Sequence, residues 1–258
     1  MKFVPKQLEE TAEASSGHEH WKEKVKNVVI IIVGTTLIYL LLGFIAEFMV
    51  TRISEETEAK LFQSIQFPTS NNPPKEFAEA QKIFDRLIAQ SDLRPLPYKL
   101  RYMGAPEPNA FAAPGGTVMV TQGLLDAATN TTALAFVLGH ELGHHQRRHT
   151  LKGIGRKAVF SITIALIFGG SDGGVVSKAV DLAEKGHSRR AEREADEFGF
   201  RLAHSIYGNA DGYMEFFQHL HEKYHGQHET WLNFAHTHPP TTERLEHLKE
   251  LQAELEGK

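Results

Sequence analysis

One stretch near the start of the chain constrains its fold more than any other feature. Residues 28–46, VVIIIVGTTLIYLLLGFIA, are nineteen residues without a charge. About twenty helical residues, at a rise of about 1.5 Å each, cross a hydrocarbon layer of ~30 Å. A cleaved signal peptide would have a shorter apolar region and a small-residue cleavage pattern, and neither is present. We therefore expect an uncleaved transmembrane signal anchor over residues 27–50, rather than a buried core helix.

The charges that flank this stretch predict its orientation. Its N-terminal side has three lysines, and its C-terminal side has one arginine followed by three glutamates (Lys22, Lys24 and Lys26; Arg52, then Glu55, Glu56 and Glu58). Because positively charged flanks stay in the cytoplasm, we expect the N-terminus inside and the rest of the chain outside. Residues 1–26 are then a poorly ordered, polar cytoplasmic tail, residues 51–75 a linker that ends in PTSNNPP, and residues 76–258 the folded domain.

The segments after the linker predict a mainly helical α+β domain. Hydrophobic spacing indicates helices over residues 75–90, 131–149, 187–207, 211–225 and 241–256. PYKLRYM, NAFAA and TVMVTQ read as short strands, and a Pro-Gly-Gly turn joins the last two into a hairpin, so we expect a small antiparallel sheet. The apolar residues 158–170 are short for a membrane span, and we expect them to be buried or to graze the membrane rather than to cross it.

The composition narrows the chemistry that the chain can perform. The absence of cysteine excludes disulfides, thiolate metal sites and a cysteine nucleophile, and it leaves His, Asp and Glu as the strong metal ligands. A net charge of -4 provides no basic surface for a phosphate backbone, so we expect no nucleic-acid partner.

The pattern H-E-x-x-H occurs twice, and it is typical of zinc peptidase sites. The first copy is HELGH and the second is HEKYH (His140, Glu141 and His144; His221, Glu222 and His225). Histidines at positions i and i+4 of a helix can direct a nitrogen at one zinc ion, and the glutamate beside them can take a proton from water. Because the chain has 15 His, one copy can arise by chance, and the sequence around each copy has to decide between them.

The surroundings favour the first copy. The residues before His140 are mostly apolar, which predicts a helix that passes through the core and carries its histidines into a pocket of low dielectric. The second copy stands beside an apolar stripe that is typical of a half-exposed surface helix, and no helix with suitable carboxylates follows it. We therefore expect no functional metal at His221 and His225, and we expect His145 and His149 to be groups on the helix surface.

A catalytic zinc site needs a third protein ligand, and the helix predicted over residues 187–207 can supply it. Glu192 and Asp196 share one face of that helix with small side chains, and Gly139 and Gly143 offer a matching small-residue stripe on the first helix. A close crossing would bring Glu192 to the metal and Asp196 to the back of a ligand histidine.

At this point the chain resembles a known family. NAFAAPGG, HELGHH, EREAD and THPPTTER match, in order, the membrane zinc metallopeptidases that include the CAAX prenyl endopeptidases, the heat-shock protease HtpX and the Oma-type stress proteases. The resemblance covers roughly residues 75–250 and implies a gluzincin-like fold. It also implies one Zn²⁺ per chain, with His140, His144 and Glu192 as its ligands and Glu141 as the catalytic base. A single N-terminal span is closer to the Oma-like and periplasmic quality-control branch.

Two further parts of the site are expected from these motifs. The oxyanion of the reaction needs a partner besides the metal, and His238 and Arg244 in THPPTTER are the candidates. An extended substrate could add to the edge of the strand Asn109, Ala110, Phe111 and Ala112, with Phe111 anchoring one face and the alanines leaving room on the other. A core hairpin strand is the alternative interpretation of this segment.

The sequence therefore predicts a membrane-anchored zinc endopeptidase that hydrolyses misfolded or membrane-associated proteins. Its expected partners are polypeptide substrates and, through the anchor, membrane lipid, and an oligomer is left open. The expected location is a bacterial inner membrane, with residues 76–258, the zinc metallopeptidase domain, facing the periplasm. A metal-binding module with a chaperone-like or scaffolding role is the alternative, although such a module has no need of Glu141 between its ligands. A histidine-rich metal-storage protein would need many exposed ligands of equal standing.

Overall fold

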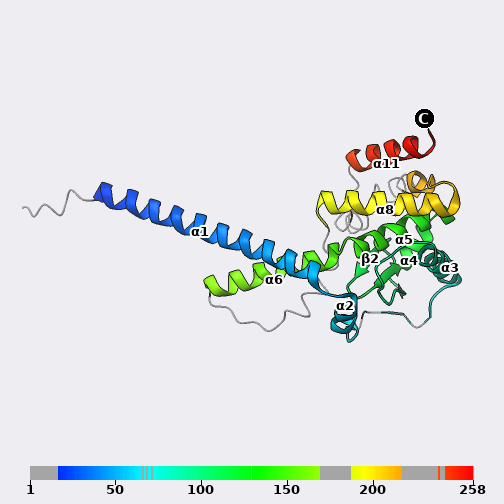
Figure 1. The fold of residues 1–258 in the computed structure, drawn as a ribbon, viewed down its shortest axis with the longest axis horizontal. Coiled ribbons are helices and arrows are strands. Elements are labelled where there is room, and N and C mark those ends of the chain that lie inside the picture. Colours follow the sequence, from blue (N-terminus) through cyan, green and yellow to red (C-terminus); the bar gives the residue numbers. More distant parts are fainter. Residues whose placement is uncertain are drawn as a thin grey trace, which may run out of the picture.

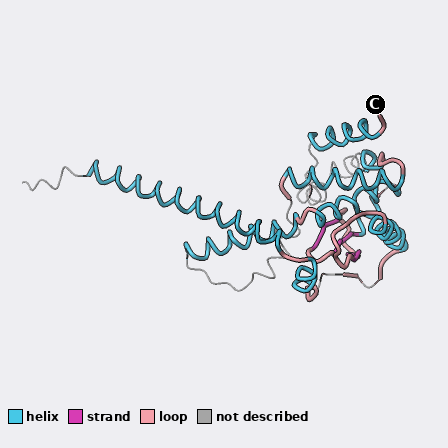
Figure 2. Tube along the Cα trace, viewed as in Figure 1, coloured by secondary structure: helices cyan, strands magenta, loops and turns pink. Residues whose placement is uncertain are grey.

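A long helix leads into a helical domain with a small sheet on one side of it (Figure 1). The computed structural model describes residues 17–65, 67, 69–70, 72–128, 130–168, 187–216, 238 and 242–257. Helices make up most of this part of the chain, and the strands form one short sheet (Figure 2). The prediction of a mainly helical α+β fold is therefore confirmed.

Helix α1, Gly17–Arg52, extends away from the domain (Figure 1). Within the described residues its segment Trp21–Arg52 is the one helix long and apolar enough to cross a membrane, with a mean hydropathy of 2.8 in its most apolar window. Most of its large apolar side chains are exposed, as expected of a helix whose solvent is lipid, and Val50 near its C-terminal end is buried. The helix begins before the apolar stretch, so residues 17–26 are helical and the prediction of a disordered tail is wrong for them.

A second helix lies within the segment predicted as a linker. Helix α2, Glu55–Phe62, begins after Ser54, whose side chain accepts a hydrogen bond from the backbone N–H of Thr57. Glu58 of this helix is buried and forms an ion pair with Arg94. The distance from Oε2 of Glu58 to Nη2 of Arg94 is 2.5 Å. The segment after the anchor is thus attached to the domain rather than free.

The sheet has three strands in the order β1-β3-β2, which are Lys99–Met103, Thr117–Thr121 and Ala110–Ala113. Strands β2 and β3 form the predicted antiparallel hairpin, whose turn contains Gly115 and Gly116 at positive φ. Strand β1 pairs parallel to β3, so the sheet is mixed and not wholly antiparallel as expected. The reason is that the hairpin folds back to place β3, rather than β2, next to β1.

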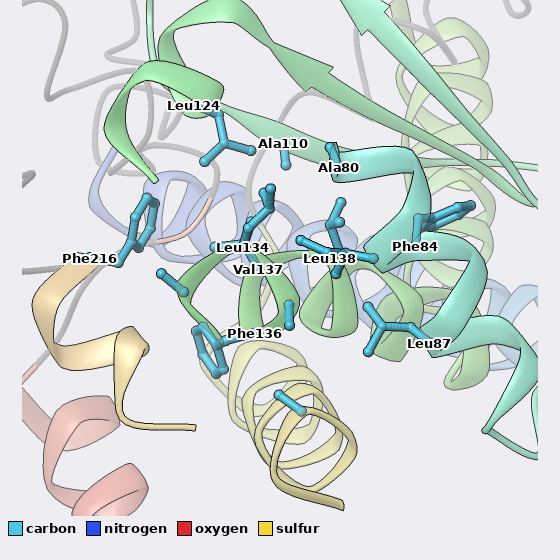
Figure 3. Packing of buried hydrophobic residues seen from close by; sticks show 14 of the residues in the cluster. Ala80, Phe84, Leu87, Ala110, Leu124, Leu134, Phe136, Val137, Leu138 and Phe216 are labelled. Atoms are coloured by element: carbon cyan, nitrogen blue, oxygen red, sulfur yellow. The ribbon is translucent and has the colours of Figure 1, made fainter. Parts of the chain in front are cut away.

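Helix α5, Thr131–Gln146, is the central element of the domain. Every residue from Ala133 to His145 is buried, because α3, Lys75–Ala89, and the sheet lie on one side and α8, Arg189–Tyr207, on the other. Figure 3 shows the core between α3 and α5 together with residues from the sheet side and from the segment after α8. Its labelled members are Ala80, Phe84, Leu87, Ala110, Leu124, Leu134, Phe136, Val137, Leu138 and Phe216.

The remaining helices close the domain. Helix α4, Gln122–Ala127, follows β3, and α11, Thr242–Leu255, packs on α8. The helix predicted over 211–225 is present over residues 212–216, and residues 217–225 lie outside the described part of the chain. The predictions of helices at α3, α8 and α11 are confirmed to within two residues at each end.

The junction after α5 differs from the expected uninterrupted helix over residues 131–149. Helix α5 ends at Gln146, and α6, His149–Phe168, starts in a new direction because Arg148 adopts a φ of 56°. The guanidinium of Arg148 donates hydrogen bonds to the carbonyls of Val50 and Ile53, at 3.0 and 2.6 Å. These hydrogen bonds connect the C-terminal end of α1 to the residues that follow α5.

Helix α6 then runs alongside the C-terminal part of α1 (Figure 1). A Cβ on Gly155 would lie 3.2 Å from a methyl group of Val50, which shows how closely the two helices approach. Helix α6 contains residues 158–168 of the apolar segment, and whether they touch a membrane stays a prediction.

The crossing of α5 and α8 depends on glycines in both helices. A Cβ on Gly199 would lie 2.5 Å from the backbone N of His140, and a Cβ on Gly143 would lie 3.0 Å from the Cα of Ala195. Both neighbours are backbone atoms, which cannot rotate away. The predicted close crossing is therefore confirmed, and it places α8 directly against His140.

We expect Gly199→Ala to destabilise the domain and to displace the donors of the candidate metal site. Overpacking of this kind costs about 1–3 kcal/mol, which exceeds the roughly 1 kcal/mol that alanine gains over glycine in a helix. Thermal unfolding of both proteins measures the difference. Gly153→Ala is the matched control, since a Cβ there meets nothing within 4 Å, and that variant should be as stable as the parent or more so. Equal stability of Gly199→Ala and the parent would contradict the tight crossing.

Candidate metal centre

Four buried side chains converge where α5 and α8 cross. They are His140, His144, Glu192 and His238, and one donor atom from each lies within 4.8 Å of all the others. The Nε2 atoms of His140 and His144 are 3.0 Å apart, because residues one turn apart lie on the same face of α5. The oxygens of Glu192 face them from α8, each 3.5 Å from one of these nitrogens. The structure thus brings Glu192 next to the two histidines of HELGH, as predicted.

The donors at this point have the chemistry of a metal site. Glu192 Oε1 and Glu141 Oε2 are buried and accept no hydrogen bond from any residue that the structure describes. Burial holds the pKa of His144 well below its usual value, so its imidazole is neutral and has a lone pair to donate. Burial by itself would raise the pKa of Glu192. The nearby His238, His140 and Arg244 lower that pKa by more than burial raises it, so the net pKa is well below its usual value and the carboxylate is ionised. Two imidazoles and one carboxylate fit a divalent metal such as zinc.

His238, an oxyanion candidate in the sequence, lies among the same donors. Its Nδ1 is 3.1 Å from both His140 Nε2 and Glu192 Oε2, and its Nε2 is 3.2 Å from the carbonyl oxygen of Ala110. Burial lowers its pKa, but the nearby carboxylates of Glu192 and Glu141 outweigh burial and raise that pKa to about 9. A side chain in this place can serve as a fourth donor or face the developing oxyanion.

Asp196 lies behind His140, as the sequence predicted. Its Oδ1 is 2.9 Å from His140 Nδ1, so the nitrogen on the other side of that ring faces the metal donors. The carboxylate is itself held by Arg244, whose Nε and Nη2 donate to it at 2.6 and 2.7 Å. Arg244 is also buried, with its Nη1 3.1 Å from Glu192 Oε2. These contacts favour a positioning role for Arg244, and its oxyanion role stays a prediction.

Glu141 stands beside the donors in the position of a general base. Burial raises the pKa of its carboxyl group, which the backbone N–H of Ala112 contacts. Its Oε1 is 3.4 Å from Nε2 of His238. A carboxylate with a raised pKa can hold a proton between two steps of a reaction.

The outward edge of strand β2 is occupied by side chains of the protein itself. The carbonyl of Ala110 faces His238, and Thr150 donates a hydrogen bond of 3.0 Å to the carbonyl of Ala112. All four side chains of the strand are buried, so the expectation that Ala110 and Ala112 leave open space is wrong. Asn109, just before the strand, bonds to Thr121 of β3 through its backbone. Addition of a substrate strand at this edge stays a prediction.

The predicted surface positions of His145 and His149 are wrong, since both side chains are buried. His145 contacts the carbonyl of Thr117 through Nε2 at 3.0 Å, and burial lowers its pKa to about 4. His149 is buried where α6 begins, and burial likewise lowers its pKa to about 4. The prediction was wrong for His145 because α5 is enclosed on every side and has no solvent-facing stripe. It was wrong for His149 because that residue begins α6 and does not continue α5.

Sequence reasoning also missed His187, whose ring stacks on that of His144 with the centroids 3.9 Å apart. Its one signal in the sequence is its place directly before Ser188, which caps the helix that carries Glu192. The second copy of the motif, His221 to His225, lies outside the described residues.

Comparisons with known proteins agree with this geometry. The family model described as Peptidase family M48 matches residues 74–252. Mitochondrial metalloendopeptidase OMA1 of Schizosaccharomyces pombe is 30% identical over 69% of the chain, which corresponds to 53% of that relative. Metalloproteases YcaL and LoiP of Escherichia coli are 33% and 30% identical over 60% and 61% of the chain. The chain spans 62% and 63% of their length.

Proposed function

Since the chain belongs to peptidase family M48, we propose that it is a membrane-anchored zinc endopeptidase that cleaves misfolded or membrane-associated proteins. The observation that carries this proposal is the convergence of His140, His144 and Glu192 with Glu141 buried beside them. The names of OMA1, YcaL and LoiP as metalloproteases support it. One Zn²⁺ per chain would be held by the two histidines and Glu192.

In the proposed reaction, each residue has a separate task. When bound, zinc supplies a Lewis acid that polarises the scissile carbonyl and makes water more acidic. Glu141 accepts the proton of the attacking water and then delivers it to the nitrogen of the leaving amine. Asp196 fixes the ring of His140 so that Nε2 keeps its lone pair for the metal, and Arg244 holds Asp196 and Glu192 in place. His238 is the nearest candidate to face the oxyanion.

The function is tested by incubating the purified full-length protein with an unfolded polypeptide such as casein. We expect cleavage that a zinc chelator stops and that added Zn²⁺ restores. If the folded protein holds zinc but does not cleave the polypeptide, the alternative is favoured, namely a metal-binding module with a scaffolding role. Cleavage that persists after the metal has been removed would overturn the proposed mechanism.

We further propose that α1 spans a membrane with the N-terminus in the cytoplasm and the domain outside, as the lysines before it indicate. Protease added from the extracytoplasmic side should then cut beyond residue 52 and spare residues 1–26. In a bacterium the domain would face the periplasm. A reporter fused after Lys258 that is active only in the cytoplasm would contradict this orientation.

A further inference from the structure

The two ligand histidines of α5 are supported by different partners. Behind His140 lies Asp196, whereas His144 Nδ1 is 3.0 Å from Nδ1 of His149. His149 Nε2 in turn is 3.2 Å from Oε2 of Glu194. We infer that His149 is a positioning residue of the metal centre, which together with Glu194 fixes the ring of His144. This inference rests on the proposed metallopeptidase function.

The arrangement of protons supports a directed chain of hydrogen bonds. His144 turns Nε2 towards the other donors, so the hydrogen of its neutral ring is on Nδ1. That N–H can donate to His149 only if Nδ1 of His149 is the nitrogen without hydrogen. His149 then carries its hydrogen on Nε2, where it donates to the carboxylate of Glu194. Each ring therefore uses both nitrogens, and the lone pair of His144 stays directed at the metal.

Helix α8 organises both supports. Its first turns carry an acidic residue at every second position, namely Glu192, Glu194 and Asp196. The proposed ligand and the two supporting carboxylates therefore come from one rigid element. Glu194 is held from its other side by Arg190, whose Nε donates to it at 2.8 Å. Movement of α8 would thus change the ligand and both supports together.

The break in the chain after α5 brings His149 to this position. A helix that continued through residue 149 would carry its side chain farther along α5, beyond reach of His144 in the previous turns. The positive φ of Arg148 instead turns the chain, and His149 becomes the first residue of α6. His149 is 6% exposed, so water does not compete freely for its contact with His144.

The inference is tested by zinc affinity, which can be measured whether or not the protein cleaves. In the full-length protein in detergent, we expect His149→Phe to weaken zinc binding by about 10–100-fold, as loss of such supports typically does. Competition with a chromogenic chelator gives the affinity. The absorption spectrum of the Co²⁺-loaded protein should also change, because the ring of His144 is no longer held at one angle.

Two further variants separate orientation from packing. His149→Asn places a carboxamide oxygen near the position of Nδ1, so it should recover most of the zinc affinity that His149→Phe loses. Glu194→Gln, which keeps an acceptor but removes the charge, should weaken zinc binding less than His149→Phe does. Failure of His149→Asn to bind zinc more tightly than His149→Phe, with both variants folded, would overturn the inference.

His145→Phe is the matched control. His145 is also buried and also contacts a hydrogen-bond partner through a ring nitrogen, but that partner is the carbonyl of Thr117 and not a metal-ligand candidate. We expect it to lower thermal stability as His149→Phe does and to leave zinc affinity unchanged. If both variants lose the same zinc affinity, the loss comes from disturbed packing and not from a specific role of His149, and the inference is overturned. A parent protein that binds zinc tightly but cleaves nothing would instead overturn the proposed function and leave this result standing.

Discussion

Replacement of Glu141 by glutamine is expected to leave about one zinc per chain and to lower peptide cleavage by roughly 10²–10⁴-fold. Glutamine has the shape of glutamate and can still accept the N–H of Ala112, so the fold and the three ligands should persist. The amide cannot take a proton from water, and the loss of this proton transfer determines how far the cleavage rate falls. Metal analysis and a casein assay on the same preparation measure both quantities.

The interpretation of this variant depends on the metal content. Normal zinc together with lost cleavage assigns Glu141 to the chemical step. Full cleavage by Glu141→Gln would show that another group is the base, and the buried position of Glu141 would then need a different explanation.

Replacement of Glu192 by alanine should remove the metal itself, so that zinc falls from about one per chain to nearly none. The change deletes the one carboxylate ligand and leaves only two of the three proposed ligands, His140 and His144, which is too few for a stable catalytic site. Arg244 keeps Asp196 as its partner, so the variant should remain folded. His144→Ala should have the same effect on zinc.

Two control variants make this result specific. Glu197→Ala lies on the same helix, where its partner is the half-exposed Arg201, and it should keep the metal. His225→Ala, in the second H-E-x-x-H copy, should keep it as well. Loss of zinc in His225→Ala with retention in His144→Ala would contradict the choice of the first copy.

The metal centre was predictable because its parts have strong local signals. The spacing of His140 and His144 fixes two ligands on one helix face, and the small residues around Gly139 and Gly199 predict a close crossing. A close crossing of these two helices is what brings Glu192 and Asp196 to the histidines. The apolar stretch likewise predicted a helix long enough to cross a membrane.

The parts that were missed depend on non-local or conformational features. The parallel pairing of β1 with β3 follows from the order of strands in space, which strand patterns along the chain do not encode. Arginine rarely adopts a positive φ, so a break at Arg148 could not be expected from the residue type. Without that break, His149 could only be interpreted as one more residue on the surface of a longer helix.

The hydrogen bonds from Arg148 to Val50 and Ile53 have a consequence for how substrate is found. With α1 in a bilayer, these bonds and the pair between Arg148 and Glu55 leave the domain no flexible tether on which to swing. The height of the catalytic groups above the lipid is then fixed by the fold. For a substrate that is itself membrane-associated, as proposed above, the two proteins would meet by diffusion in two dimensions, and the density of that substrate in the membrane would set the rate of encounter.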